Sequence, residues 1–245
     1  MDKKIKLSVV LPCYNEEENV KRIPAELILE LNKLKLRYEI IAVDDGSKDN
    51  TYSELNKLKK KYPFVKVIQH KQNKGLACAV KTGIDNATGE LTVTLDTDFT
   101  FHPRQIKNLL ERFNKGDADV VIGSPSLRGY DKDVPYYRIL ISKFGAISYN
   151  IALGKKITAV TPIFRLYKTN QLKEINLNPK PMSRGGFGIN AEILAKLLMK
   201  RRRVVEIPAE LTVRKYGESK MNNFKEIIRQ LKLASKILYW RLTAK

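Results

Sequence analysis

Two acidic motifs stand where apolar runs of the sequence end, and they are the residues best suited to chemistry. Asp96-Thr97-Asp98 follows the run at 91–95, and Asp44-Asp45 follows the run at 38–43. The apolar and β-branched residues of these runs predict buried strands. Carboxylates at the mouth of a strand are poor core residues, but hard divalent cations prefer carboxylate oxygens and share them with substrate phosphates. The pattern therefore indicates a site for a nucleotide and its metal.

The elements that must position these carboxylates alternate between strand and helix through the first half of the chain. The hydrophobic periodicity predicts strands at 6–11, 39–43, 65–70, 90–95 and 119–123, and helices at 16–36, 47–62, 75–88 and 103–115. Such alternation predicts an α/β fold with a mostly parallel sheet covered by helices on both faces. In these sheets ligands bind beyond the carboxyl ends of the strands, which is where the acidic motifs lie.

The second half of the sequence is less regular. We expect one helix or two short ones over 135–153, a strand at 164–167, a helix at 189–200, strands at 203–207 and 210–214, and a basic helix at 222–242. The sequence has neither an internal repeat nor a low-complexity linker. We therefore expect one domain over 1–221, with 222–245 as a C-terminal amphipathic helix that is either part of it or membrane-associated.

Charge is the strongest feature of the composition. The 245 residues carry 46 Lys and Arg against 26 Asp and Glu, a net charge of +20. This surplus favours polyanionic partners such as nucleotides, nucleic acid or an anionic membrane, although a lysine-rich proteome would produce it too. The amino terminus lacks an apolar signal region, and no run approaches the roughly 20 apolar residues that span a bilayer. We therefore expect an intracellular, cytoplasmic protein.

The basic C-terminal helix has two interpretations. Its apolar residues recur at helical spacing from Phe224 to Leu242, Lys and Arg occupy much of the remainder, and Tyr239-Trp240 lie near its end. One interpretation is a helix that lies on an anionic membrane surface. The other is a closing helix that packs its apolar stripe on the sheet. Both remain open for different parts of the helix.

The turn after the first predicted strand carries a second set of candidates. In Pro12-Cys13-Tyr14-Asn15-Glu16, proline fixes the turn, the ring can stack on a base, and the carboxylate can accept hydrogen bonds from base or ribose. An ordinary strand–helix turn capped by Asn15 would have the same composition. No Gly-x-Gly-x-x-Gly follows the first strand and no P-loop motif occurs, so hydride transfer and kinase-like chemistry are disfavoured. A nucleoside diphosphate held by a metal and by arginines remains.

These motifs resemble those of family 2 glycosyltransferases, which have the GT-A fold. The similar residues are Pro12-x-Tyr14-Asn15-Glu16, Val43-Asp44-Asp45-Gly46-Ser47, Asn73-Lys74-Gly75, Asp96-Thr97-Asp98, Phe164-Arg165 and Arg214-x-x-Gly217-x-Ser219-Lys220. Within the family, the order resembles that of the polyprenyl-phosphate sugar synthases, a group that includes the dolichyl-phosphate mannose synthases. The chain departs from the usual pattern at Thr100, Pro125 and Pro162-Ile163, where Gln, Arg and Ser-Gly are usual.

The resemblance implies roles for particular residues. It implies that the nucleoside contacts are Pro12, Tyr14, Glu16, Val43 and Asp45. It also implies that Asp96 and Asp98 bind Mg²⁺ or Mn²⁺, that Thr97 contacts the nucleotide, and that Arg214 and Lys220 face the phosphates. Asp98, Arg214 and Lys220 would then act directly in the reaction.

The resemblance thus implies an inverting, metal-dependent transfer of a sugar from a nucleotide-sugar to a polyprenyl (dolichyl) phosphate, by a protein peripheral on the cytoplasmic face of a membrane. One alternative is a family 2 enzyme with a saccharide or other soluble acceptor, which would need a general base such as Glu192. Another is a basic nucleic-acid-binding module. That alternative accounts for the net charge but not for acidic pairs that would repel a phosphate backbone, so we expect no nucleic-acid partner.

Overall fold

A single sheet organises the chain. The computed structural model describes residues 5–128, 136–177, 188–216 and 223–243. Their strands form a seven-stranded sheet in the order β3-β2-β1-β4-β6-β5-β7, in which only β6 runs antiparallel to its neighbours. The strands are β1 (Leu7–Cys13), β2 (Tyr38–Asp44), β3 (Val65–Gln69), β4 (Leu91–Thr94), β5 (Val120–Ser124), β6 (Arg165–Lys168) and β7 (Val204–Pro208). The predicted α/β class and mostly parallel sheet are confirmed.

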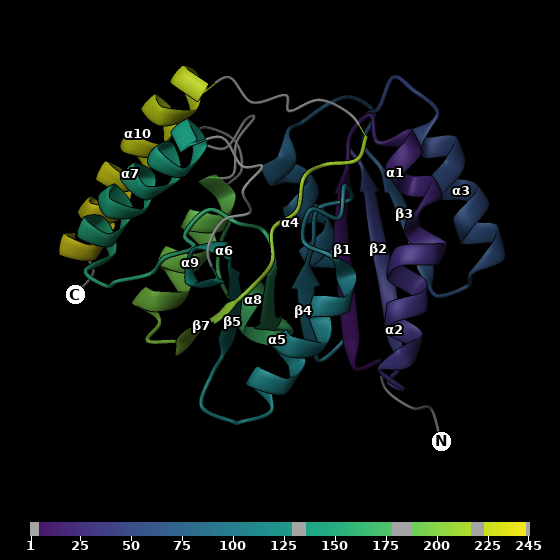
Figure 1. The fold of residues 1–245 in the computed structure, drawn as a ribbon, viewed down its shortest axis with the longest axis horizontal. Helices are drawn as coiled ribbons and strands as arrows, with labels where there is room; N and C mark the ends of the chain where they lie inside the picture. Colours follow the sequence, from purple (N-terminus) through teal and green to yellow (C-terminus); the bar gives the residue numbers. More distant parts are fainter. Residues whose placement is uncertain (1–4, 129–135, 178–187, 217–222, 244–245) are drawn as a thin grey trace.

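Helices cover both faces of this sheet (Figure 1). One layer contains α1 (Glu17–Lys21), the π-helical η1 (Ile23–Ile28), α2 (Leu29–Lys33), α3 (Thr51–Lys61), the 3₁₀ turn η2 (Pro103–Gln105) and α5 (Ile106–Phe113). The other contains α4 (Leu76–Asn86), α8 (Thr169–Lys173) and α9 (Gly188–Met199). Alternate residues of β1 serve the two layers, with Leu7, Val9 and Leu11 packed into one core and Val10 into the other. This is the expected consequence of side chains alternating across a strand.

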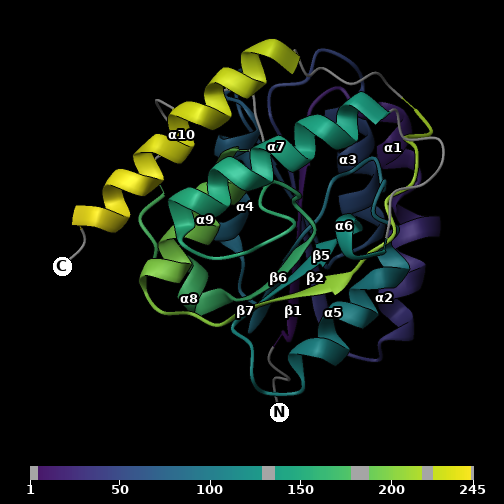
Figure 2. The ribbon, with the colours of Figure 1, turned by 60° about the vertical axis from the view of Figure 1, so that its left-hand side comes forward.

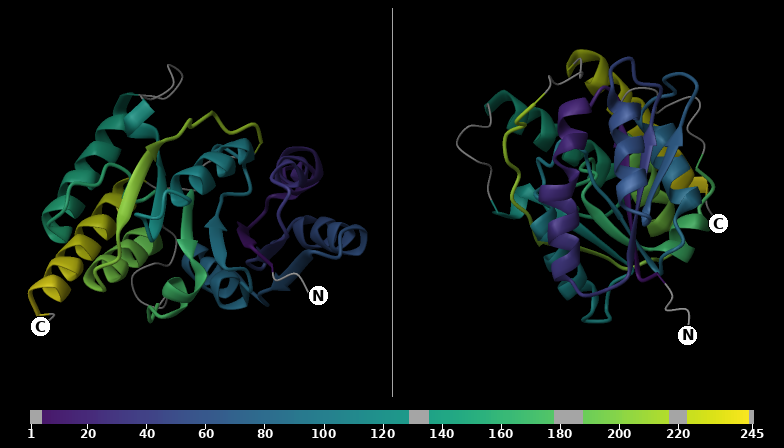
Figure 3. Two further views of the ribbon diagram at one scale, coloured as in Figure 1. Left: turned by 90° about the horizontal axis from the view of Figure 1, so that it is seen from below. Right: turned by 90° about the vertical axis from the view of Figure 1, so that its right-hand side faces the viewer.

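Two longer helices lie outside the second layer. α7 (Tyr136–Leu153) and α10 (Asn223–Thr243) pack against each other, and α10 also packs against α9 (Figure 2). Seen from below, this pair lies at one end of the molecule and α3 lies at the other (Figure 3). Of the range 135–153, the described residues 136–153 form one helix rather than two. Among the described residues, no helix combines the length and hydropathy needed to cross a membrane.

Two predicted elements differ from the structure. The expected helix at 16–36 is divided into α1, η1 and α2, because Pro24 lacks the N–H of a regular turn and Leu29 instead donates to its carbonyl one residue farther along. The strand expected at 210–214 does not form, and that prediction was wrong. The segment hydrogen-bonds to the loop before α5 instead, with the N–H of Thr212 donating to the carbonyl of Thr100 at 2.8 Å.

The sheet brings the acidic motifs to one edge. β1, β2 and β4 are adjacent and parallel, so their carboxyl ends lie together (Figure 1). Asp44 is the last residue of β2, and Asp96 follows the end of β4 by two residues. The turn after β1 begins at the same edge, next to both. The three predicted motifs thus meet where ligands bind in sheets of this kind.

Candidate active site

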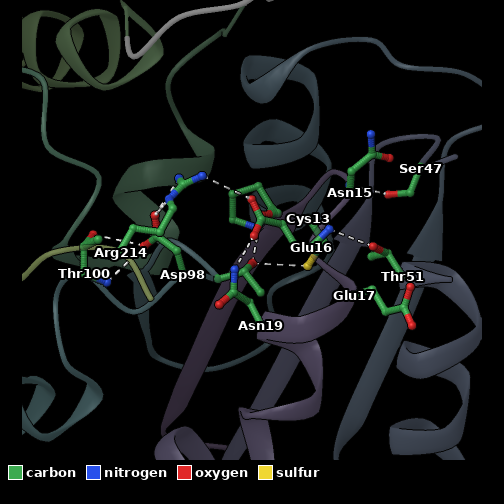
Figure 4. A network of polar contacts seen from close by, with 12 residues as sticks. Cys13, Asn15, Glu16, Glu17, Asn19, Ser47, Thr51, Asp98, Thr100 and Arg214 are labelled. Atoms are coloured by element: carbon green, nitrogen blue, oxygen red, sulfur yellow. Dashed lines mark hydrogen bonds and ion pairs between the residues drawn. The ribbon is translucent and has the colours of Figure 1, made fainter. Parts of the chain in front are cut away.

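The turn after β4 holds Asp98 in a fixed orientation. Its Oδ1 accepts hydrogen bonds from the N–H and the hydroxyl of Thr100, both at 3.0 Å. Its Oδ2 accepts from Arg214, at 2.8 Å from Nε and 2.6 Å from Nη2 (Figure 4). The backbone of Phe99 has a φ of 54°, which places this turn in the left-handed region that a bulky residue adopts only when its surroundings require it. The carboxylate is therefore oriented before any ligand arrives.

Glu16 approaches the same guanidinium from the turn after β1. Its Oε1 lies 3.9 Å from Nη1 of Arg214, and its Oε2 accepts from the Asn19 amide at 2.5 Å. Its N–H donates to the hydroxyl of Thr51 at 2.8 Å. Figure 4 shows Arg214 between the carboxylates of Asp98 and Glu16. The structure thus brings together Glu16, Asp98 and Arg214, which were all assigned to the site from the sequence. Glu16 and Arg214 are 198 positions apart in the chain (214 − 16).

Arg22 is a structural member of this site that the sequence did not indicate. Its Nη1 donates to the Asp98 carbonyl at 3.2 Å, and its Nε and Nη2 bond the two carboxylate oxygens of Glu26 at 2.8 Å each. Its guanidinium also lies over the rings of Phe99 and Tyr216, 5.5 and 5.7 Å from their centroids. In sequence, Arg22 and Glu26 form an ordinary i, i+4 helix pair, which gave no signal of contacts to the β4 turn.

The segment that carries Arg214 is fixed by the side chain of Gln105 in η2 and by the backbone of Thr100. The Gln105 amide oxygen accepts from the N–H of Glu210 at 2.7 Å, and its amide nitrogen donates to the carbonyl of the same residue at 2.9 Å. The hydroxyl of Thr212 donates to the Thr100 carbonyl at 3.1 Å. Arg214 therefore reaches Asp98 through pairing with the β4–α5 loop rather than through a strand. Lys220, also assigned to the phosphates, lies outside the described residues.

Asp45 is occupied by contacts with its own chain. Its Oδ1 accepts from the N–H of Lys74 at 2.9 Å and lies 2.7 Å from Nδ1 of His70, and its Oδ2 accepts from the N–H of Gly75 at 2.7 Å. The residue is 2% exposed. A carboxylate has about four acceptor positions, so a nucleoside has one left to use. The Nε2 of His70 lies 3.0 Å from the hydroxyl of Thr82, which fixes the ring on α4.

The remaining candidates form the floor between β1, β2 and β4. Pro12 pairs with Val43 across the two strands, and both are buried. The hydroxyl of Thr97 donates to the Pro12 carbonyl at 3.0 Å and lies 3.3 Å from the Cys13 sulfur, so it joins the β4 turn to β1. Tyr14 is half-buried at the rim. Pro12, Val43 and Thr97 are therefore buried together where β1, β2 and the β4 turn meet.

The charge balance at the β4 turn suits a divalent cation. Burial and the neighbouring carboxylate of Asp98 raise the pKa of Asp96 well above its ordinary value, although Arg214 opposes the shift. A positive charge between Asp96 and Asp98 would offset this repulsion, and carboxylates are the protein ligands that Mg²⁺ and Mn²⁺ prefer. Within the described ranges, no cluster of three or more His, Cys, Asp or Glu side chains is placed to hold a metal ion.

Two solved structures that resemble this fold contain bound UDP. Glucosyl-3-phosphoglycerate synthase from Mycobacterium tuberculosis, solved with Mn²⁺, UDP and glucosyl-3-phosphoglycerate, superposes with a TM-score of 0.70 at 17% identity, covering 96% of this chain and 80% of that one. TarS from S. aureus, solved with UDP, gives a TM-score of 0.61 at 20% identity, covering 94% and 65%. At these identities the likeness extends to the fold, and it confirms the predicted GT-A architecture.

Two curated relatives match nearly the whole chain at higher sequence identity. The protein is 36% identical over 239 residues to a dolichol-phosphate mannosyltransferase of Pyrococcus furiosus, covering 96% of this chain but only 64% of the archaeal protein. It is 30% identical over 248 residues to the dolichol-phosphate mannosyltransferase of Saccharomyces cerevisiae, covering 98% of this chain and 90% of the yeast protein. The family model described as glycosyl transferase family 2 matches residues 8–176. The chain therefore belongs to glycosyl transferase family 2 and is a glycosyltransferase.

Proposed function

We propose that the protein transfers a sugar from a nucleotide-sugar to a polyprenyl phosphate, with inversion at the anomeric carbon and with Mg²⁺ or Mn²⁺ bound by Asp96 and Asp98. The observation that carries this proposal is the arrangement of Asp98, Arg214 and Glu16 at the carboxyl edge of the sheet. The names of the two relatives that match nearly the whole chain favour a mannosyl group and a dolichyl phosphate acceptor.

In this reaction the protein would orient the two substrates and offset the charge of the leaving diphosphate, without forming a covalent bond to either. The metal, when bound, neutralises the diphosphate whose charge grows as the glycosidic bond breaks. Arg214 hydrogen-bonds to the carboxylate of Asp98. Its guanidinium would therefore meet a phosphate oxygen that approaches Asp98. Orientation of two reactants in this way contributes roughly 7–11 kcal/mol to lowering a barrier.

The acceptor supplies its own nucleophile. The second pKa of a phosphate monoester is about 6, so the phosphate is largely dianionic at neutral pH and needs no strong general base. A hydroxyl acceptor would need one, and Glu192 was the candidate. In the structure, Glu192 is buried on α9 and its Oε1 bonds the Lys196 ammonium at 2.5 Å. This pairing favours a structural role for Glu192 and supports the phosphate acceptor.

The nucleoside would bind over the floor formed by β1 and β2. In this proposal Tyr14 stacks on or flanks the base, Glu16 and the remaining acceptor position of Asp45 bond base or ribose, and Pro12, Val43 and Thr97 shape the pocket. Lys220 belongs to the proposal as a phosphate contact on the strength of the sequence motif alone.

A lipid acceptor would bring the protein to an anionic membrane surface as a peripheral protein on its cytoplasmic face. α10 buries Leu233, Ala234 and Ile237, which supports the packing interpretation for that face, but it packs mainly on α7 and α9 rather than on the sheet as expected. Among its Lys and Arg residues, α10 also exposes the large apolar side chains of Ile228, Leu231, Tyr239 and Leu242. The neighbouring helix α7 exposes Ile147 and Ile151. Apolar groups flanked by cations are typical of helices that bind anionic lipid, with about 1 kcal/mol per basic residue, screened by salt.

The proposal is tested with the purified chain, a panel of nucleotide-sugars, Mn²⁺ and a short-chain polyprenyl phosphate in detergent. We expect one donor to give a lipid-phosphate sugar, and its nucleoside diphosphate at 100 times its dissociation constant to stabilise the fold by about 2.7 kcal/mol. Cosedimentation with liposomes containing anionic lipid tests the surface, with Lys232→Gln and Lys236→Gln as variants. Transfer only to a soluble sugar would contradict the proposed acceptor.

A further inference from the structure

The segment 158–163 connects α7 to β6 and runs along the active-site edge. β6 is antiparallel to β4, with Arg165 opposite Thr94, so the residues before Arg165 run beside the residues that follow Thr94. On the other side, the N–H of Gly123 in β5 donates to the Phe164 carbonyl at 3.0 Å. The segment therefore lies between the turn that carries Asp96 and the carboxyl end of β5.

One side of this segment is held by a carboxylate. Glu206 of β7 accepts from the N–H of Thr158 at 3.0 and 2.9 Å with its two oxygens, and from the N–H of Ala159 at 2.7 Å. Its Oε1 also accepts from the Thr158 hydroxyl at 3.0 Å, and that hydroxyl lies 2.7 Å from the hydroxyl of Ser124. A single acidic side chain thus fixes two consecutive peptide groups and ties them to β5 and β7.

The other side is held by a buried arginine. Arg165 is 0% exposed, and its Nη2 donates to the carbonyls of Ala159 and Val160 at 3.1 and 2.5 Å, while its Nη1 donates to the Asn190 carbonyl at 2.8 Å. The amide of Asn190 donates to the Thr161 carbonyl at 2.9 Å. These two residues come from β6 and α9, so the sheet and a helix hold the same stretch of backbone.

The carbonyl of the segment's last residue is bound by a side chain of β4, the strand that precedes Asp96. The hydroxyl of Thr94 donates to the Ile163 carbonyl at 2.5 Å. Four side chains from four elements, Thr94, Arg165, Asn190 and Glu206, therefore bind the backbone of one short irregular segment. Burying a guanidinium whose hydrogen-bond partners are carbonyls is costly, because desolvation removes several kcal/mol of hydration per ion. A plain connection between elements would not require such an arrangement, which points to a segment whose position matters.

We call Thr94, Arg165, Asn190 and Glu206 the clamp on segment 158–163. The segment that this clamp holds exposes few of its own side chains. Ala159, Val160 and Ile163 are buried, whereas Thr161 and Pro162 are half-exposed. The β4–β6 pairing ends at Thr94 and Arg165, and its continuation leads us to expect these two residues beside the turn of Asp96. A nucleotide-sugar with its base over β1 and β2 and its diphosphate at the β4 turn would then extend its sugar beyond β4, toward Thr161 and Pro162.

We propose that the segment 158–163 is the wall that contacts the transferred sugar, that Thr161 and Pro162 are specificity-determining residues, and that Glu206 and Arg165 are positioning residues that hold them. This inference rests on the proposed nucleotide-sugar donor but not on the acceptor. The four clamping side chains touch the segment's backbone rather than the nucleoside or diphosphate positions. Loss of a clamp is therefore expected to affect recognition of the sugar and to leave recognition of the nucleoside diphosphate unchanged.

Binding measurements separate these two effects. Calorimetry with Mn²⁺ gives the dissociation constants of the nucleotide-sugar and of its nucleoside diphosphate for wild type, Glu206→Gln and Thr161→Ala. We expect both variants to bind the nucleoside diphosphate like wild type, and the preference of wild type for its own sugar over an epimeric donor to fall by about tenfold, equivalent to 1.4 kcal/mol. Thr161→Ala removes a half-exposed side chain and leaves the side chains that hold the segment in place, so its effect does not depend on a loss of stability.

Glu39→Gln is the matched control. Glu39 is also a buried carboxylate that fixes backbone, accepting from the N–H of Thr88 at 2.6 Å, but it lies near the opposite ends of the strands. It should lower the melting temperature and leave the preference between epimeric donors unchanged. An unchanged preference in both Glu206→Gln and Thr161→Ala, or equal losses for the nucleotide-sugar and the nucleoside diphosphate, would overturn the inference. A wild type that binds a nucleotide-sugar but does not transfer to polyprenyl phosphate would overturn only the proposed acceptor.

Discussion

Arg214 donates two hydrogen bonds to a single oxygen of Asp98, the carboxylate proposed to bind the metal. The other oxygen of Asp98 is taken by Thr100, so a cation that binds Asp98 must share Oδ2 with the guanidinium or displace it. A diphosphate arriving with the cation offers Arg214 new acceptors within the same site. Metal, nucleotide and arginine are therefore expected to bind as one coupled set.

Asp98→Asn should abolish Mn²⁺-dependent binding of the nucleoside diphosphate. The amide keeps the shape of the side chain but loses the charge that attracts the cation, so affinity in Mn²⁺ should fall by about 100-fold, toward the value in chelator. Calorimetry with and without Mn²⁺ measures this difference. Asp117→Asn, which removes an exposed carboxylate paired with Arg112 far from the site, serves as the control. Full Mn²⁺-dependent binding in Asp98→Asn would refute the metal assignment.

Asp45→Ala should weaken the free nucleoside and the nucleoside diphosphate by the same factor. The lost contact involves neither phosphate nor metal, and the N–H groups of Lys74 and Gly75 lose their acceptor as well. Leaving such donors unpaired costs about 1–3 kcal/mol of stability, so the melting temperature should fall too. A loss confined to the nucleoside diphosphate would assign Asp45 to the metal and phosphate part of the site.

Lys220→Ala should slow transfer to polyprenyl phosphate much more than hydrolysis of the nucleotide-sugar by water. The expectation follows from the proposed contact with the acceptor phosphate, for which a charge-assisted bond contributes about 1.5–3 kcal/mol. Lys215→Ala is the matched control, because Lys215 is an exposed neighbour paired with Glu26 at 3.3 Å. Equal slowing of both reactions would place Lys220 on the donor diphosphate instead.

The pH dependence of the melting temperature tests how Asp119 stabilises the fold. Burial alone would raise the pKa of this carboxyl, but bonds from Lys168, the N–H of Arg203 and Gln171 hold it below its ordinary value. A depressed pKa stabilises the fold above the unfolded value of about 3.9. That contribution should diminish as the pH falls through this value toward the folded pKa. Asp119→Asn should therefore lower the melting temperature at pH 7 and flatten its decline in acid. An identical acid decline in wild type and variant would contradict this assignment.

The sequence predicted the sheet and the edge at which the site forms, because alternation and strand-end carboxylates are local signals. It did not predict the contacts of Arg22, since an i, i+4 pair with Glu26 conceals the distant partner, Asp98. The clamp on 158–163 was also missed, because it depends on which strands are neighbours. The strand predicted at 210–214 has suitable residues, but hydrogen bonds to Thr100 and Gln105 satisfy its backbone instead.

The most direct test of the account is the transfer reaction itself. Purified protein, a nucleotide-sugar labelled in the sugar, Mn²⁺ and a polyprenyl phosphate should give labelled lipid that partitions into organic solvent, with the anomeric configuration inverted. Chelation of the metal and Asp98→Asn should each abolish the product, while Asp117→Asn should give as much as wild type. Label that never enters the lipid fraction with any nucleotide-sugar, in a protein that is folded and binds nucleoside diphosphate, would contradict the proposed function.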